Sequence, residues 1–333
     1  MDRQSAFMRR DRRSAMGGAA DMNEERQISN LLVYKDGSRL IVSRKYDSAN
    51  DLWIVMDHYG SNRLIGFLEW RLAPNAGAEP DPDFGRPSIG CQGEGSDWIG
   101  PYIVEAAEGS ADCRRTFTGG NHAFDGNTGG TTTAVTSRCD VYADEADIAE
   151  RTAISVDTVT LRTVNEVQGF NTKLEDGSGR AVLRETVTYT FVADSVRIHN
   201  RIEMLEDVTM HRYYGLQTVN RFWNGSVQYG SAGIAYGETY PVNGESDSGT
   251  GAHTRKTDRV RVVSADRLHA LEACLDRSSG LGRAKYVSGE LPIAFSKVYG
   301  KSYFNLIHGP VPHFRAGDTL EWSGAYRFFR TDV

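Results

Sequence analysis

The feature that most constrains the fold is a pair of neighbouring segments in which apolar and polar side chains alternate. Residues 181–192 read AVLRETVTYTFV and residues 195–205 read SVRIHNRIEML, with Ala193-Asp194 between them. A period of two residues is the period of a β-strand, and a strand with one apolar face and one polar face is typical of an antiparallel sheet with one solvated side. The two segments therefore predict adjacent, half-buried antiparallel strands.

Similar strand patterns recur along most of the chain. We predict further strands at 31–34, 39–42, 52–57, 63–70, 98–106, 211–219, 259–263, 291–299, 303–308 and 319–329. Residues 265–276 show the only helical spacing, with Leu268, Leu271 and Leu275 on one face. No repeat of the length used by propellers or solenoids is present. The sequence predicts an all-β protein, a large antiparallel β-sandwich with at most one or two short helices.

The organisation of the chain follows from its composition. Residues 1–28 are polar, lack hydrophobic periodicity and contain no apolar core of a secretory signal, so we expect a flexible leader. Residues 29–333 are expected to form a single large β-sandwich domain. The Gly/Pro/acidic stretch 74–96 is long enough to be a functional or mobile loop. These observations leave the localisation open, although a glycan substrate suggests extracellular or virion-associated action.

Several classes of function are disfavoured. The formal net charge is −6 and no basic stripe occurs beyond the first thirteen residues, so we expect no nucleic-acid partner. No apolar run reaches the roughly 18 residues of a membrane span, so we expect no membrane partner. Motifs for ATP, NAD and α/β-hydrolase chemistry are absent.

We expect no cofactor, but a divalent metal is left open because Asp57, His58 and Asp125 are conceivable ligands. The chain has four cysteines, Cys91, Cys113, Cys139 and Cys274, and none of them forms a CxxC pair. Their spacing is consistent with any of three alternative disulfide pairings or with free thiols. The oligomeric state is also left open.

The region from about residue 180 to 330 resembles a known family. The resemblance is carried by ETVTYTF at 185–191, VRIHNRIEM at 196–204, HRYYGLQTV at 211–219 and DTLEW at 318–322. These segments resemble the galactose-mutarotase-like β-supersandwich of carbohydrate-active proteins. The resemblance covers under half of the chain and implies a broad sheet that presents polar and aromatic side chains to a sugar. Polysaccharide lyases, epimerases, mutarotases and some hydrolases share this fold, so a polysaccharide or oligosaccharide is the expected partner.

A glycine-rich segment, Gly119-Gly120-Asn121-His122, is the first candidate for chemistry. In lyases that act on uronates, an amide such as Asn121 neutralises the carboxylate, and a base such as His122 removes the neighbouring proton. The alternative is an ordinary turn in which Asn121 caps backbone groups.

The segment 211–214 supplies the other candidate catalytic residues. In a regular strand, His211 and Tyr213 share one face, and Arg212 and Tyr214 share the other. The first pair offers a base and an acid, and the second offers a carboxylate clamp and an acid. The alternative is aromatic packing within the sheet.

The leading hypothesis is a polysaccharide lyase that cleaves a uronate-containing glycan by β-elimination. The catalytic candidates are Asn121, His122, His211, Tyr213 and Tyr214. The substrate-binding candidates are Arg212, Arg221, Trp223, Trp98 and Asp125, because arginine grips carboxylates and tryptophan stacks on sugar rings. Two alternatives stay open. One is a glycoside hydrolase with paired carboxylates drawn from Glu69, Asp97, Asp125 and Glu203. The other is a non-catalytic glycan-binding or adhesin module of a phage tail or cell surface.

Overall fold

The computed structural model describes residues 31–92, 96–126, 129–231, 235–242 and 257–331. The predicted leader 1–28 lies outside these residues. The described part is built from sheets in which every strand pair but one is antiparallel, and its one helical element is the 3-10 turn η2 (Gly280–Arg283). The prediction of an all-β sandwich is confirmed. The prediction of a single domain over 29–333 stays a prediction.

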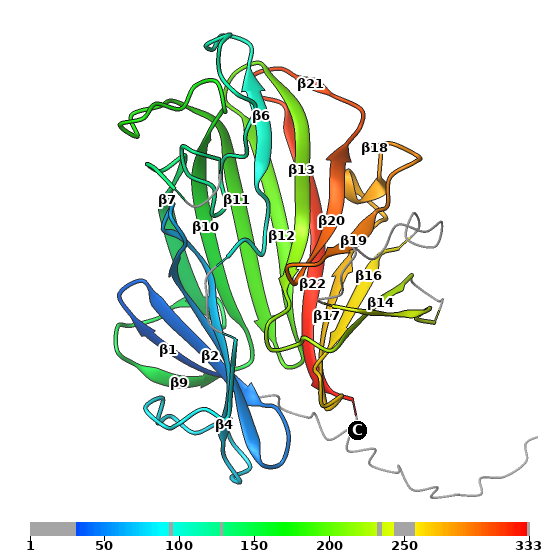
Figure 1. Ribbon diagram of the computed structural model, residues 1–333. Coiled ribbons are helices and arrows are strands. Elements are labelled where there is room, and N and C mark those ends of the chain that lie inside the picture. The colour runs from blue at the N-terminus through cyan, green and yellow to red at the C-terminus, as the bar shows by residue number, and fades with distance from the viewer. Residues whose placement is uncertain (1–30, 93–95, 127–128, 232–234, 243–256, 332–333) are drawn as a thin grey trace, which may run out of the picture.

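Three sheets make up the described part of the chain (Figure 1). The first has the order β5 (Gly90–Gln92), β4 (Leu64–Pro74), β3 (Asn50–Tyr59), β2 (Arg39–Lys45), β1 (Leu31–Asp36) and β9 (Ala153–Val156). The second, with ten strands, has the order β15 (Thr239–Pro241), β14 (Ser226–Gly230), β16 (Arg259–Val263), β17 (His269–Leu275), β22 (Thr319–Arg330), β12 (Ser195–Met204), β11 (Ala181–Val192), β10 (Val159–Gln168), β7 (Ala134–Ala143) and β8 (Ala146–Asp147). The third contains β18 (Tyr286–Val287), β20 (Lys301–His308), β13 (Val208–Val219) and β21 (His313–Phe314), with β19 (Ala294–Lys297) on β20 and β6 (Tyr102–Ala106) on β13.

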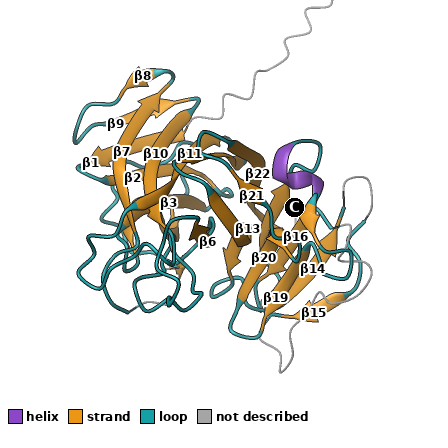
Figure 2. Cartoon of the chain, turned by 90° about the horizontal axis from the view of Figure 1, so that it is seen from above, coloured by secondary structure: helices purple, strands orange, loops and turns teal. Residues whose placement is uncertain are grey.

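The ten-stranded sheet forms one layer of the sandwich, and the other two sheets cover its inner face (Figure 2). On β12 the buried residues are every second one: Val196, Ile198, Asn200, Ile202 and Met204. Their neighbours, including Arg197, His199 and Arg201, are exposed on the outer face. The alternation read from the sequence is thus the alternation between core and solvent.

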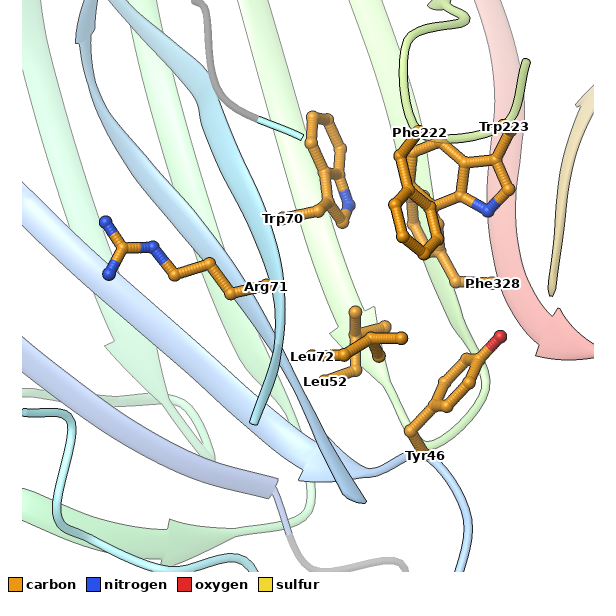
Figure 3. A pocket seen from close by; sticks show the side chains of 8 residues that line it. All are labelled: Tyr46, Leu52, Trp70, Arg71, Leu72, Phe222, Trp223 and Phe328. Atoms are coloured by element: carbon orange, nitrogen blue, oxygen red, sulfur yellow. The ribbon is translucent and has the colours of Figure 1, made fainter. Parts of the chain in front are cut away.

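Aromatic side chains join the first sheet to the ten-stranded sheet. Phe67 on β4 packs edge-on against Tyr189 of β11 and Tyr326 of β22. A small apolar hollow of about 10 Å³ lies beside this contact, lined mainly by aromatic and leucine side chains (Figure 3). Arg71, the charged residue of this group, points away from the aromatic rings and pairs with Glu69 at 2.5 Å. The hollow is therefore part of the core packing rather than a ligand site.

A buried polar network joins the third sheet to the ten-stranded sheet. The Tyr213 hydroxyl on β13 accepts hydrogen bonds from Trp322 Nε1 at 2.8 Å and Asn200 Nδ2 at 3.0 Å. Asn200 Nδ2 also donates to the buried carboxylate of Glu185 at 3.1 Å. The Tyr213 ring stacks on Tyr102 of β6 with centroids 4.4 Å apart. Tyr213 is therefore a core residue that fixes β13 on the central sheet.

Replacing Tyr213 by phenylalanine is expected to lower the free energy of unfolding by about 1–3 kcal/mol, because two buried donors lose their acceptor. Urea unfolding of the purified variant measures this change. Tyr142→Phe is a matched control, since Tyr142 is a half-buried tyrosine at the far side of the ten-stranded sheet, and it should change the stability by no more than about 0.5 kcal/mol. Equal stability of the two variants would contradict the structural role of the Tyr213 hydroxyl.

The helix expected over 265–276 is absent, and this prediction was wrong. Residues 269–275 form strand β17, which pairs with β16 and β22 on its two sides. Leu271, Ala273 and Leu275 are buried and spaced by two residues, so the same leucines satisfy a strand as well as a helix. A short apolar run cannot distinguish the two periods, and the position between two strands decides the outcome.

Candidate functional site

The main candidate site is a pocket on the outer face of β13 and β20, the face turned away from the ten-stranded sheet. Its volume is about 440 Å³. The lining residues come from two loops, two strands and the turn before β20: Ser96, Asp97, Pro101, Phe117, Asn121, His122, Tyr214, Gln217, Tyr299, Lys301 and Tyr303. The structure thus brings Asn121 and His122 to the same pocket as Tyr214, although the two segments are more than ninety residues apart in sequence.

Two glycines shape the loop that carries Asn121 and His122. Gly119 and Gly120 have φ of +73° and +50°, a region that disfavours side chains. The His122 amide donates to the Gly119 carbonyl at 3.0 Å and closes a tight turn. A Cβ atom on Gly120 would lie 2.2 Å from Asp97 Oδ1. The loop therefore needs glycine at this position in order to approach Asp97.

Gly120→Ala is expected to lower the free energy of unfolding by about 2–4 kcal/mol, because the backbone strain adds to a clash with a buried carboxylate. Gly37→Ala is the matched control: Gly37 has φ of +60°, but a Cβ there meets nothing within 4 Å. Thermal unfolding of both variants separates the strain that they share from the contact that only Gly120 makes. If Gly37→Ala were as destabilising as Gly120→Ala, the close approach to Asp97 would have no energetic consequence.

Asp97 is the electrostatic centre of the pocket. Its Oδ2 atom lies 3.6 Å from Lys301 Nζ and 3.3 Å from His122 Nε2, and its Oδ1 atom accepts the Asn121 amide. Burial opposes the charge on Asp97, but Lys301, His122 and the Asn121 amide together outweigh burial and lower the pKa of the carboxyl group. Burial also lowers the pKa of Lys301, and Asp97 opposes that shift. One buried carboxylate thus contacts both the amine of Lys301 and the ring of His122.

His122 is held at both ring nitrogens. Its Nδ1 atom lies 2.7 Å from the Gly126 carbonyl, which can only accept, so Nδ1 carries a proton. Its Nε2 atom faces Asp97. A histidine placed in this way lacks a free nitrogen to take a proton from a ligand. The sequence assigned His122 the role of base, and the geometry suits it instead to orienting Asp97.

Asn121 has one atom engaged and one available. Its Oδ1 atom accepts a hydrogen bond from the Ser61 amide at 2.6 Å, and a Cβ on Gly60 would collide with it. This is the capping role that the alternative interpretation of the sequence expected. Because Oδ1 faces Ser61, Nδ2 is the atom that the side chain can offer to a ligand.

Aromatic rings form the walls of the pocket. Tyr214 packs against Phe117 and Tyr303, with centroids 5.7 Å and 4.9 Å apart. The hydroxyls of Tyr299 and Tyr303 lie 2.9 Å apart, and Tyr299 is 65% exposed at the rim. Burial raises the pKa of Tyr214, and Arg212, which donates to its hydroxyl at 3.4 Å, opposes the shift. Tyr214 is therefore a neutral phenol at physiological pH and can donate a proton.

The two other catalytic candidates lie outside this pocket. Tyr213 is fully buried in the core network described above. His211 bonds to Glu105 at 2.7 Å. A β-bulge at His211 interrupts the pairing with β6, so His211 and Tyr213 do not share a face as a regular strand would require. Arg212 lies beside Tyr214 and contacts His308 Nε2 at 2.6 Å. Burial and the Arg212 charge lower the pKa of His308 to about 4.

The remaining substrate-binding candidates are not among the lining residues. Trp98 and Trp223 are 2% and 3% exposed and pack with Trp70 in the core. Arg221 and Asp125 are exposed on loops. The residue type of these four candidates does not show whether a side chain lies in the core, on the surface or in the pocket.

No sequence motif singles out Lys301 or Gln217, and Asp97 is only one of several carboxylates that the sequence offers. Lys301 is the first residue of β20, directly after the Tyr299-Gly300 turn, so the sequence signal for it is a charged residue between two tyrosines.

Within the described ranges, no group of three or more His, Cys, Asp or Glu residues could hold a metal ion. Cys113, Cys139 and Cys274 are free thiols, and the side chain of Cys91 lies outside the described residues. The described residues also include no helix long and apolar enough to cross a membrane.

Comparisons with known proteins give a weak structural likeness. No family model and no curated protein matches the sequence. Among solved structures, the chain is similar to the GH36 alpha-galactosidase AgaB from Geobacillus stearothermophilus, with 12% identity and a TM-score of 0.45 over 90% of this chain and 41% of that chain. It is also similar to galactose 1-epimerase from Lactobacillus acidophilus, with 8% identity and a TM-score of 0.36 over 91% of this chain and 99% of that chain.

The chain thus spans about two fifths of the length of the alpha-galactosidases that it matches. Because proteins with one fold carry many functions, the function has to be inferred from the pocket itself.

Proposed function

We propose that the protein is a carbohydrate-active enzyme that binds a uronate-containing glycan in this pocket and cleaves it by β-elimination. The observation that carries the proposal is the position of Lys301, an amine whose side chain is 13% exposed and which lines an aromatic pocket beside the side-chain amide of Asn121. Its Nζ atom contacts Asp97 at 3.6 Å and Ser96 Oγ at 3.2 Å, and the Tyr303 ring lies 5.4 Å away.

The polar groups and the walls of the pocket suit an acidic sugar. The amine of Lys301 and the amide nitrogen of Asn121 can both donate hydrogen bonds to a ligand, so the pocket suits a ligand that brings a carboxylate. The exposed ring of Tyr299 at the rim and the ring of Tyr303 inside offer apolar faces on which a pyranose can stack. Sugar sites combine these two features because a sugar has apolar C–H faces and polar edges.

The available atoms can be assigned to the steps of β-elimination. In this assignment Asn121 Nδ2 hydrogen-bonds the uronate carboxylate, which makes the C5 proton more acidic. Lys301, in its neutral form, takes that proton, and the burial that lowers its pKa favours this form. The electrons of the C5–H bond form the C4–C5 double bond as the C4–O bond breaks, and Tyr214 protonates the departing oxygen. No water is consumed.

The glycoside hydrolase alternative is less well supported. A two-carboxylate mechanism needs an acid and a second carboxylate on opposite sides of the bond that is cleaved. Among the described lining residues only Asp97 has a carboxyl group, and its pKa is lowered rather than raised. Asp97 is therefore a poor general acid.

Incubation of the purified protein with polygalacturonate, alginate and hyaluronan tests the proposal. We expect new reducing ends together with the ultraviolet absorbance of an unsaturated uronate for one of these polymers. Tyr214→Phe should lower this rate by about 10²–10⁴-fold, as for loss of a general acid, whereas Tyr142→Phe should not change it. Reducing ends without the absorbance would identify a hydrolase, and binding without cleavage would identify a binding module. Either result would exclude the lyase.

A further inference from the structure

Gln217 combines complete burial with a position at the pocket wall. Its neighbour Leu216 points into the core, where a Cβ on Gly324 would lie 2.5 Å from the leucine side chain. The next side chain on β13 therefore points to the pocket face. The Gln217 amide nitrogen of the backbone donates to the Trp98 carbonyl at 3.0 Å, which holds this part of the strand in place.

The side-chain amide of Gln217 is a buried polar group whose hydrogen bonds are unsatisfied within the described residues. Both Oε1 and Nε2 are buried, and neither has a partner in the described part of the chain. A buried amide without partners destabilises the folded state, because it has given up its hydrogen bonds to water. Nearby polar groups do not relieve this cost: Lys301 pairs with Asp97, and the Tyr303 hydroxyl pairs with Tyr299.

The chemistry of the amide defines what it can bind. A primary amide presents an acceptor and a donor side by side, so it can hydrogen-bond two hydroxyl groups on adjacent ring carbons at the same time. Each sugar hydroxyl both donates and accepts, so two neighbouring hydroxyls can satisfy both atoms of Gln217. The cross-strand partner of Gln217 is Tyr303, whose ring supplies the apolar surface beside such a pair.

We infer that Gln217 is a specificity-determining residue that binds two adjacent hydroxyl groups of the sugar in the pocket. This inference rests on the proposed sugar site but not on β-elimination. It predicts that the pocket discriminates between sugars that have both hydroxyls and sugars that lack one of them. A site whose buried polar group is left unpaired rejects such an analogue strongly.

Titration calorimetry with two ligand sets tests the inference. The first set is the methyl glycoside of D-glucuronate with its singly deoxygenated analogues, and the second is the neutral methyl glucoside with the corresponding analogues. In the wild type, removal of one hydroxyl of the bound pair should weaken binding at least about tenfold. In Gln217→Met the parent sugar should bind as weakly as that analogue, while the binding of the analogue should be nearly unchanged.

The melting temperature separates this role from a structural one. Gln217→Met removes an unpaired amide and keeps the side-chain volume, so the melting temperature should be unchanged or higher. Gln228→Met, which alters a glutamine that already bonds to Thr239, is the control and should bind all ligands like the wild type. A lower melting temperature together with an equal loss for every ligand would overturn the inference.

The two ligand sets also separate this inference from the proposed function. If only the neutral sugars bind, the uronate proposal fails, and the same comparison still decides the role of Gln217. If the acidic parent sugar binds but Gln217→Met retains the discrimination against its analogues, the inference fails and the uronate site stands. Binding of neither set would overturn both.

Discussion

Replacing Asp97 by asparagine is expected to lower the free energy of unfolding by about 3–5 kcal/mol, because it leaves the largely buried Lys301 ammonium, whose side chain is 13% exposed, without its partner. Asn keeps the size of the side chain and can still accept the Asn121 amide. The loss therefore reports the charge of Asp97 rather than packing. Denaturant unfolding at neutral pH measures it.

The effect of Asp97→Asn should depend on pH in a defined direction. The folded-state pKa of Asp97 is lowered, so its contribution to stability is complete above the pKa of about 4 that an unfolded aspartate has. That contribution is lost as the pH falls through the lower folded-state pKa. The stabilities of wild type and variant should therefore converge in acid. They should also approach each other in alkali, where Lys301 becomes neutral and no longer needs a counter-charge.

Two controls define the origin of the loss. Asp97→Asn combined with Lys301→Met removes both charges and should recover much of the stability lost by the single variant. Glu206→Gln breaks an ion pair with Arg180, in which the side chains of Arg180 and Glu206 are 51% and 24% exposed. This change should lower the free energy of unfolding by less than about 1 kcal/mol. A double variant as unstable as Asp97→Asn would show that the charge of Lys301 is not the cause.

The sequence predicts much of the fold because the strands of the ten-stranded sheet have one wet face. β11 spans 181–192 and β16 spans 259–263, as the alternation and β-branched residues indicated. Where a strand is buried on both faces, the period carries less information. β17 is the example, since four consecutive residues from Ala270 to Ala273 are buried and its leucines also fit a helix.

The site was partly predictable for a related reason. Two glycines followed by an asparagine and a histidine indicate a turn at 119–122, and the tyrosines of 211–214 indicate a strand with a polar face. The distance between these two segments depends on long-range strand pairing, which the sequence does not show. The bulge at His211 changes which residues of β13 face outward, and a bulge leaves little trace in one sequence. The ion pair that Lys301 forms with Asp97 joins residues about two hundred positions apart, so the sequence alone does not show it.

Lys301 is expected to be the residue on which cleavage depends most. Lys301→Met should lower the rate of β-elimination by about 10²–10⁴-fold, because it removes the group assigned as base. Lys285→Met, which alters an exposed lysine beside Tyr286, is the matched control and should cleave at the wild-type rate. Circular dichroism and the melting temperature of Lys301→Met establish that the variant is folded.

Lys301→Arg distinguishes a base from a carboxylate clamp, because arginine keeps the positive charge but stays protonated at any pH that the protein tolerates. If Lys301 is the base, the arginine variant binds the polyuronate within about tenfold of the wild type and does not cleave it. The wild-type rate should then rise with pH through the lowered pKa of Lys301, since the neutral amine is the active form. An arginine variant that still cleaves would show that Lys301 acts only through its charge, and the base would have to be sought elsewhere in the pocket.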